Sequence, residues 1–338
     1  MLSIRQTSRV FGLSLLFSLA AVSAQAQDTI KIGLLRLTSH SPSIIAEAKG
    51  YFAEQKLKVE FVTFQAAQPM AVAIASGDVD FGVTAISASL LNLAQKDVVR
   101  IIGGALTESQ GIDGQKILVS KSAFDAGLVT PAQLKGHSFG VTTQGSSFHY
   151  MAHKIADKEG FARSEIKIKP LQKVPAVIAA LKSAQIDAWS IVPNIAGALT
   201  KSGEIKAIGN VSDYVDGYQV TTIFTSKKNV MERRALVQKF IVAFEQGVDT
   251  YNAALVRKTL AVAETDAVVK MIHQYVYSDQ PIEKAGPRIK AGAMLVSPNG
   301  ELNLASVKDQ LEWFQSEGMV SKDLTMDQLV DTSFVKAK

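Results

Sequence analysis

From residue 28 onward the chain alternates short β-branched segments with amphipathic helical segments, and this alternation constrains the fold more than any other feature. Strands are predicted at 30–35, 59–64, 79–84 and 99–106, and helices between them at 43–55, 69–76 and 88–96. Strands and helices in alternation are typical of an open, mostly parallel sheet flanked by helices. The sequence therefore predicts the α/β class.

A polar, glycine-containing segment (TESQGIDG, 107–114) interrupts the alternation, which then begins again. Further strands are predicted at 115–120, 138–142, 166–171, 186–192, 205–211 and 220–225, further helices at 147–159 and 176–184, and mostly helix from 231 to 330. Two segments echo each other, MAVAIASGDVDF and AVIAALKSAQIDAW, each an apolar helix followed by a turn and a strand start. We predict two similar lobes with a ligand cleft between them, lobe 1 from 27–114 and 226–338 and lobe 2 from 115–225.

The N-terminus, residues 1–26, has the three parts of a secretory signal peptide. Arg5 and Arg9 supply the positive charge, residues 10–22 form the apolar centre, and an Ala-Gln-Ala cleavage motif ends at Ala26. As a helix, the apolar centre would span only about 20 Å, which is short of the roughly 30 Å bilayer core. We therefore predict export to the periplasm with cleavage near Ala26, rather than a membrane anchor.

Composition excludes several classes of protein. The chain has no cysteine, which excludes disulfides, a lipidated cysteine, thiolate metal sites and cysteine nucleophiles. The formal net charge of +5 falls to +3 when Arg5 and Arg9 leave with the signal, and no basic cluster interleaved with aromatic residues is present. Nucleic acid is therefore not an expected partner. We expect a free monomer without a cofactor.

Uncharged polar or small residues follow several predicted strands. Ligands of open α/β sheets bind at the carboxyl ends of the strands, so these positions are predicted to bind the ligand. They are Thr38, Ser39 and His40 after the first strand, Gln65 after the second, Thr84, Ala85 and Ser87 after the third, and Gln144, Gly145, Ser146 and Ser147 before the helix at 147–159.

The Gly-Ser-Ser segment is the sharpest of these signals. Gly145 permits close approach of the backbone, and Ser146 and Ser147 lie at a helix N-terminus, where free N–H groups and the helix dipole favour an anion. The alternative is that one of these serines only caps the helix. His40 is a further candidate, as a hydrogen-bond donor to an anion.

Two other features receive structural interpretations. His149 and His153 have the i, i+4 spacing of a zinc pair, but no third ligand is evident, so surface or capping roles are predicted and no metal is expected. Trp189 is predicted to pack in the core or to stack on an organic ligand. Ser146 lacks the G-x-S-x-G context of a nucleophile, and no carboxylate pair suits acid–base chemistry, so no catalytic residue is assigned.

Five segments together resemble the periplasmic substrate-binding proteins of ATP-driven importers for nitrate, sulfonates, taurine and thiamine-pyrimidine precursors. They are EAKGYF at 47–52, ASGDVDFG at 75–82, LKG at 134–136, QGSS at 144–147 with His149, and DAW at 187–189. The resemblance extends from about residue 30 to residue 226. It implies a two-lobed, type II-like fold that closes by hinge motion around one small solute and docks on an inner-membrane ABC permease with its ATPase.

The resemblance also bears on the site. Ligand contacts of the family fall on Thr38, Ser39, Gln65, Thr84, Ala85 and Gly145 to Ser147. Sulfonate binders often carry an aromatic and an acidic residue before a proline after the DAW segment, where this chain reads Ile191-Val192-Pro193-Asn194. The pocket is therefore expected to be more apolar there, and Asn194 is a candidate contact.

The expected function is that of a periplasmic solute-binding component that holds a small organic anion, a sulfonate or carboxylate, with hydroxyl groups and helix N-termini. A neutral heterocycle or aromatic compound, such as a thiamine-pyrimidine precursor, is the alternative ligand. A sensory module that presents its solute to a membrane receptor is the alternative role. Thiamine-pyrimidine synthases of this fold use a cysteine-rich iron-binding segment, which this chain lacks, so an enzyme is not expected.

Overall fold

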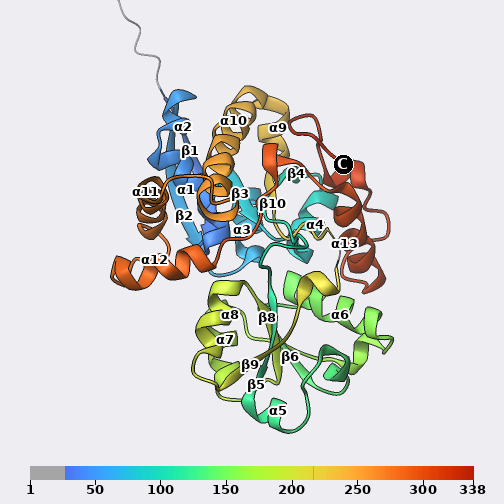
Figure 1. The fold of residues 1–338 in the computed structure, drawn as a ribbon. Helices are drawn as coiled ribbons and strands as arrows, with labels where there is room; N and C mark the ends of the chain where they lie inside the picture. Colours follow the sequence, from blue (N-terminus) through green and yellow to red (C-terminus); the bar gives the residue numbers. More distant parts are fainter. Residues whose placement is uncertain (1–26, 216) are drawn as a thin grey trace, which may run out of the picture.

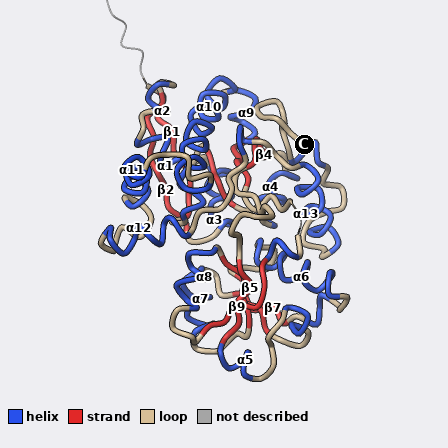
Figure 2. The backbone as a smooth tube through the Cα atoms, in the orientation of Figure 1, coloured by secondary structure: helices blue, strands red, loops and turns tan. Residues whose placement is uncertain are grey.

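The computed structural model describes residues 27–215 and 217–338, so the signal peptide predicted at 1–26 lies outside the described residues. The described chain forms two lobes stacked one above the other, each with its own sheet and flanking helices (Figure 1). Figure 2 shows the strands as two separate groups, one in each lobe. Among the described residues, no helix has both the length and the apolar character needed to cross a membrane.

Lobe 1 is built on a five-stranded sheet in the order β2-β1-β3-β10-β4. Strand β1 pairs in parallel with both β2 and β3, with Ile30 opposite Val59 and Ile32 opposite Phe81, whereas β10 runs antiparallel to β3 and β4. The strands are β1 (Asp28–Leu35), β2 (Leu57–Phe64), β3 (Phe81–Thr84), β4 (Val99–Gly104) and β10 (Thr222–Ser226). The helices between them are η1 (Thr38–His40), α1 (Ser41–Ala48), α2 (Tyr51–Glu54), α3 (Ala67–Ser76) and α4 (Ala88–Gln95).

Lobe 2 repeats this plan in the order β7-β6-β8-β5-β9, with β6 parallel to β7 and β8, and β5 antiparallel to β8 and β9. The strands are β5 (Lys116–Ser120), β6 (Ser138–Val141), β7 (Lys167–Pro170), β8 (Ala188–Ile191) and β9 (Ile205–Asn210). The helices are α5 (Lys121–Asp125), α6 (Ser147–Glu159), α7 (Val174–Lys182) and α8 (Pro193–Thr200), with the short turns η2 (Pro131–Leu134), η3 (Arg163–Glu165) and η4 (Val211–Asp213).

The echoed segments occupy equivalent places in the two lobes. Helix α3 leads into β3, the middle strand of the first sheet, and α7 leads into β8, the middle strand of the second. The lobe boundary differs from the expected one. Because β10 pairs with β3 and β4, the chain has re-entered lobe 1 by Thr222, a few residues before the return predicted at 226.

The remainder of the chain is helical and packs on lobe 1. It contains α9 (Lys227–Glu232), α10 (Arg234–Tyr251), the π-helical turn η5 (Asn252–Val256), α11 (Val262–His273), α12 (Ile282–Ala291), η6 (Pro298–Gly300), α13 (Leu304–Ser316) and α14 (Met326–Leu329). Helices α11 and α12 lie on one side of lobe 1, and α13 lies on the other side, above α6 of lobe 2 (Figure 1).

One predicted helix is broken in two. We expected a continuous helix over 43–55, but Gly50 has a φ of +81° and separates α1 from α2. Glycine adopts this left-handed conformation without the steric cost that a β-carbon imposes. The break turns the short helix α2 so that Phe52 is buried beside Phe240 of α10.

Phe240 anchors α10 to the sheet of lobe 1. Its ring stacks on Phe81 of β3 with centroids 3.9 Å apart and also meets Phe52 and Phe244. All four rings are buried. Stacked rings of this size bury large apolar areas, so this cluster is a principal source of stability in lobe 1.

We expect Phe240→Ala to lower the free energy of unfolding by about 3–5 kcal/mol, because the substitution leaves a cavity against Phe81. Phe240→Leu should lose less, since much of the volume is kept. Denaturant unfolding of the chain lacking residues 1–26 measures both. Val262→Ala, at a residue that is 76% exposed, serves as the control and should change the free energy by less than about 0.5 kcal/mol. Equal losses in all three variants would contradict this assignment.

Candidate functional site

A cavity of about 70 Å³ lies between the lobes, several times the roughly 10–15 Å³ that one water molecule requires. Both lobes supply its walls, largely from the carboxyl ends of β1, β3, β6 and β8 and from the helix starts that follow them. Its lining is Leu35, Leu37, Ser39, His40, Ala66, Ala67, Thr84, Ala85, Leu106, Gln115, Thr142, Ser146, Ser147, Phe148, Val174, Ile191, Val192, Val220 and Thr221. This is the strand-end position at which open α/β sheets bind ligands.

Ser146 has an unsatisfied hydroxyl in this cavity. It is the N-cap residue of α6, but its side chain makes no capping hydrogen bond. Its Oγ is buried and has no hydrogen-bond partner among the described residues. An orphaned buried hydroxyl costs about 1–3 kcal/mol, which a ligand that hydrogen-bonds to Ser146 would recover. We weighed a helix cap against a ligand contact for this residue. Because Ser146 does not make the capping bond, its hydroxyl is available for the ligand contact.

The lining carries no Asp, Glu, Lys or Arg side chain. Burial lowers the pKa of His40 from its ordinary 6.5 to about 4, so His40 is neutral at pH 7. Its Nδ1 accepts a hydrogen bond from the Leu35 amide at 3.3 Å, and the ring also hydrogen-bonds to the Val83 backbone. His40 therefore forms part of the wall, with both ring nitrogens engaged by the protein, and does not offer the donor that we predicted for an anion.

Positive potential in the cavity comes from helix ends instead of from cations. The lining contains the first residues of α3, at Ala67, and of α6, at Ser147. Free N–H groups and the dipole of a helix N-terminus favour a negatively charged or electron-rich group. Ser39 and Thr84, which carry hydroxyl groups, line the same cavity from the lobe 1 side.

Gln115 is a polar lining residue that our sequence reasoning missed. It ends the first crossing between the lobes, and both its backbone N–H and its Nε2 donate to Glu108 Oε1, at 3.0 and 3.1 Å. Glu108 is buried, and burial raises the pKa of its carboxyl group. The hydrogen bond from Nε2 fixes the orientation of the Gln115 amide. The available signal was its place directly after the polar segment 107–114.

Further lining residues were also missed. Thr142 belongs to the loop that we identified, and Ile191 and Val192 belong to the apolar segment noted after Trp189, but the crossing residues Leu106, Val220 and Thr221 gave no local signal. They reach the cavity only because the two crossings run side by side, which depends on the tertiary fold.

Gln144 and Gly145 lie outside the lining and join the lobes to each other. The Gly145 carbonyl accepts a hydrogen bond from the Ala88 amide of lobe 1 at 3.0 Å, and Gln68 Nε2 donates to the Gln144 carbonyl at 3.1 Å. Gly145 has a φ of +68°, and a β-carbon there would lie 2.7 Å from that of Ala88. Glycine is thus required both by the backbone conformation and by the closed contact between the lobes.

Thr38 and Asn194 lie at a second junction between the lobes. A β-carbon on Gly292 would come within 2.7 Å of Asn194 Cγ and 2.8 Å of Thr38 Oγ1, so the three residues are in tight contact. Asn194 Nδ2 donates to the Tyr277 hydroxyl at 2.5 Å. The segment that follows α11 therefore holds Asn194 at this junction, and Asn194 is not part of the cavity lining.

The remaining predicted residues, Ser87, Gln65 and Trp189, do not line the cavity. Ser87 Oγ accepts a hydrogen bond from the Leu90 amide and caps α4. Gln65 is not part of the lining. Trp189 is fully buried, and its ring lies 5.6 Å from that of Phe148, which does line the cavity. Of the two roles weighed for Trp189, the structure places it in the core, behind Phe148.

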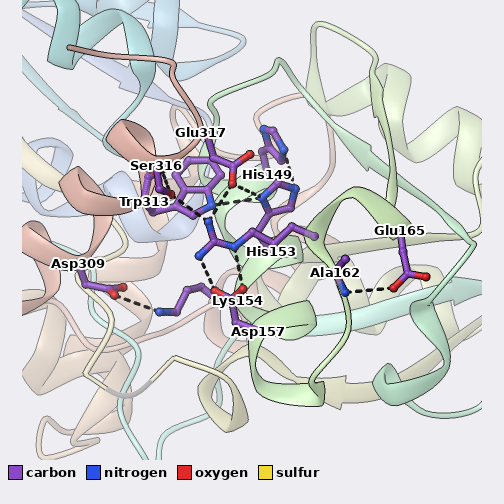
Figure 3. Close-up of polar contacts among 11 residues, drawn as sticks. His149, His153, Lys154, Asp157, Ala162, Glu165, Asp309, Trp313, Ser316 and Glu317 are labelled. Atoms are coloured by element: carbon purple, nitrogen blue, oxygen red, sulfur yellow. Dashed lines mark hydrogen bonds and ion pairs between the residues drawn. The ribbon is translucent and has the colours of Figure 1, made fainter. Parts of the chain in front are cut away.

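Of the surface or capping roles expected for His149 and His153, the surface role is wrong, whereas His149 makes a capping contact at the start of α6, because its Nδ1 accepts a hydrogen bond from the Gly145 amide. Both side chains are buried, and they face Trp313 of α13. The C-terminal helices cover this side of α6, which periodicity within α6 alone does not reveal (Figure 3).

Similarities to solved structures agree with this geometry. The alkanesulfonate-binding protein SsuA of Xanthomonas axonopodis pv. citri, solved with MOPS bound, is similar with a TM-score of 0.69 and 20% identity, over 90% of this chain and 98% of that one. The periplasmic nitrate-binding protein NrtA of Synechocystis PCC 6803 has a TM-score of 0.65 and 12% identity, over 89% and 83%. The desulfurization enzyme DSZB is similar with a TM-score of 0.57 and 14% identity, over 91% and 97%.

These similarities show the two-lobed fold of periplasmic binding proteins, as the sequence predicted. The model of the family described as NMT1/THI5 like matches residues 37–254, more than half of the chain, and the chain belongs to this family. No curated protein sequence gives a match.

The pH dependence of stability tests the state of His40. The unfolded chain takes up a proton near pH 6.5 and the native chain only near pH 4, so the free energy of unfolding falls as the pH drops through this interval. The full contribution of His40 is about 3 kcal/mol at 1.36 kcal/mol per pH unit. Unfolding titrations between pH 4 and 8 should show a shallower loss for His40→Gln. A slope identical to that of the wild type would contradict a buried, neutral His40.

Gly145→Ala should open the cleft, because the added β-carbon collides with Ala88. Gly160→Ala is a matched control, since Gly160 also has a positive φ, +75°, but no atom lies within 4 Å of its β-position. Both variants should lose about 1–2 kcal/mol of stability from the left-handed backbone. Only Gly145→Ala should raise the radius of gyration measured by small-angle X-ray scattering. A rise in both, or in neither, would contradict the role of Gly145 in closure.

Proposed function

We propose that this chain is the exported solute-binding component of an ABC-type importer. In this proposal the signal peptide is cleaved near Ala26 and the mature chain is a periplasmic monomer. The protein binds a small solute in the interlobe cavity and delivers it to a membrane permease. Membership in the NMT1/THI5-like family and the fold shared with periplasmic binding proteins support this role. Enclosure of the cavity by both lobes supports it too, because hinge closure couples solute binding to the shape of the protein.

The proposed solute is a small organic anion, a sulfonate or carboxylate. The observation that carries this proposal is the unpartnered, buried Ser146 Oγ at the N-terminus of α6. Hydrogen bonds to a charged group contribute about 1.5–3 kcal/mol each, so two or three of them support micromolar binding after the costs of association. The lining contains no carboxylate to repel an anion.

A neutral heterocycle or aromatic compound is the second candidate, and one observation favours it. The lining has no cationic side chain, while Phe148 and aliphatic residues form much of the wall. An uncharged ring would be held by apolar contact, with Gln115 and the hydroxyls supplying its hydrogen bonds.

Paired probes separate the two candidates. Methanesulfonate and dimethyl sulfone have similar shapes but differ in charge, and benzoate and benzamide form a second such pair. Thermal unfolding of the chain lacking residues 1–26 should show stabilisation by the anionic member of a pair, about 2.7 kcal/mol at 100 times the dissociation constant. Stabilisation by the neutral members alone would select the second candidate. No response to these probes or to a wider panel of small solutes would overturn the binding role.

Ser146→Ala should weaken binding of the best probe by about 10- to 100-fold, because one charge-assisted hydrogen bond is lost. Isothermal titration measures the change. Thr143→Ala is the matched control, since Thr143 Oγ1 is also buried without a partner in the described chain but lies outside the lining. Equal affinity for the wild type and Ser146→Ala would remove Ser146 from the site.

A further inference from the structure

Helix α6, whose first residues line the cavity, carries two buried histidines that contact Trp313 of α13. His149 and His153 are each 4% exposed, and their rings lie 4.3 Å apart. On one side, His149 Nδ1 lies 3.2 Å from the Gly145 amide nitrogen. On the other side, His153 Nδ1 lies 3.5 Å from Glu317 Oε1, at the end of α13 (Figure 3). The two Nε2 atoms are 3.0 Å apart, so the rings form a continuous chain of polar contacts.

The positions of the protons in this chain of contacts follow from which atoms can donate a hydrogen bond and which can accept one. The Gly145 amide can only donate, so Nδ1 of His149 must be the acceptor. A neutral imidazole carries one proton, which in His149 is then on Nε2 and is donated to Nε2 of His153. The proton of His153 is therefore on Nδ1, facing the Glu317 carboxylate.

The indole of Trp313 competes with Glu317 for the same atom. Trp313 Nε1 has the geometry of a hydrogen bond donated to His153 Nδ1, at 3.3 Å, and this bond forms only when Nδ1 carries no proton. If Trp313 donated to Nδ1, the proton of His153 would be on Nε2 and would point at the Nε2 proton of His149. Two N–H groups cannot form a hydrogen bond with each other, so a donating Gly145 amide is compatible only with a proton on Nδ1 of His153. The arrangement with Nδ1–H directed at Glu317 satisfies every other partner in the chain of contacts.

Both histidines are held neutral by their surroundings. Burial lowers the pKa of His149 to about 4, with repulsion from His153 adding to the effect. Burial also lowers the pKa of His153, against the opposing influence of Glu317. Each ring therefore carries one proton at neutral pH, which is the condition under which the protons were assigned.

Arg163 fixes Glu317 to lobe 2. Its guanidinium lies 2.8 Å from Glu317 Oε1 and 3.0 Å from Ser316 Oγ, and it makes two further contacts with Asp157 of α6, at 2.7 and 2.8 Å. Bidentate contacts of this kind hold a planar guanidinium in one orientation. The Glu317 carboxylate is thereby held in position beside His153.

At its other end the relay meets the loop that carries the proposed solute contacts. The Gly145 amide donates to His149 of lobe 2, and the Gly145 carbonyl accepts from Ala88 of lobe 1. Ser146 and Ser147 follow directly. We propose that His149 and His153 are positioning residues of the solute site, and that a relay from Gly145 through both rings to Glu317 holds the Gly-Ser-Ser loop in its binding conformation. The proposal rests on the proposed function for its meaning, but its tests require no solute.

The tautomers are measured directly by long-range ¹H–¹⁵N correlation spectra of the five histidines at pH 7. We expect the proton on Nε2 of His149 and on Nδ1 of His153. Glu317→Leu should reverse both tautomers, because Trp313 then donates to His153 Nδ1 and His149 Nε2 becomes the acceptor. Glu317→Gln should retain the wild-type tautomers, since the amide oxygen of the glutamine can still accept a hydrogen bond. Asp157→Asn is the control, because Arg163 keeps its contacts with Ser316 and Glu317 and the acceptor beside His153 remains, so both tautomers should stay unchanged.

Exchange of the Gly145 amide hydrogen with solvent reports on the far end of the relay. Glu317→Leu and His149→Ala should each accelerate it about tenfold, the effect of losing one ordinary hydrogen bond. His149→Asn should retain protection, because its Oδ1 takes the place of Nδ1. The Val141 amide in β6 corrects for any change in global stability. An Nε2 proton on His153 in the wild type, or unchanged Gly145 exchange in Glu317→Leu, would overturn the relay and leave the Ser146 result untouched.

Discussion

The pairing of the two chain crossings is the constraint on which the rest of the structure depends. The first crossing leaves β4 and the second enters β10, and the Leu106 carbonyl accepts the amides of both Val220 and Thr221, at 2.8 and 3.1 Å. Gln219, which is fully buried, donates from Nε2 to the carbonyls of Leu106 and Thr221. This pair of crossing segments sets the position of one sheet relative to the other. Its residues Leu106, Val220 and Thr221 also line the cavity.

Much of the fold followed from the sequence, because β-branched runs and helical periodicity are local signals. All ten predicted strands are present, and the helix predicted at 147–159 has those bounds. The errors arose where one residue or a distant segment decides the outcome. Gly50 divides a helix, and β10 belongs to lobe 1 because of its partners β3 and β4, not because of its own composition.

The candidate site was predictable only in part, for a related reason. Post-strand position identifies Ser39, Thr84 and Ser146, because parallel strands end at a common edge. The comparison with the family pattern after the DAW segment selected Asn194, which the Tyr277 hydroxyl holds at the junction between the lobes. Post-strand position did not identify Gln115, whose place in the lining depends on the crossing and on buried Glu108. Local sequence patterns predict candidates, and contacts between distant segments decide which of them line the cavity.

The uncharged cavity suits the proposed role, in which a solute must be both captured and released. A buried lysine or arginine would remain uncompensated in a closed, empty cavity, at a desolvation cost of several kcal/mol. Helix N-termini and hydroxyls carry no net charge, so they attract an electron-rich group without that cost. Their weakness is orientation, because a hydroxyl on a loop turns easily. The fixed peptide of Gly145, bonded to lobe 1 through its carbonyl and to His149 through its amide, removes this freedom from the loop before any solute arrives.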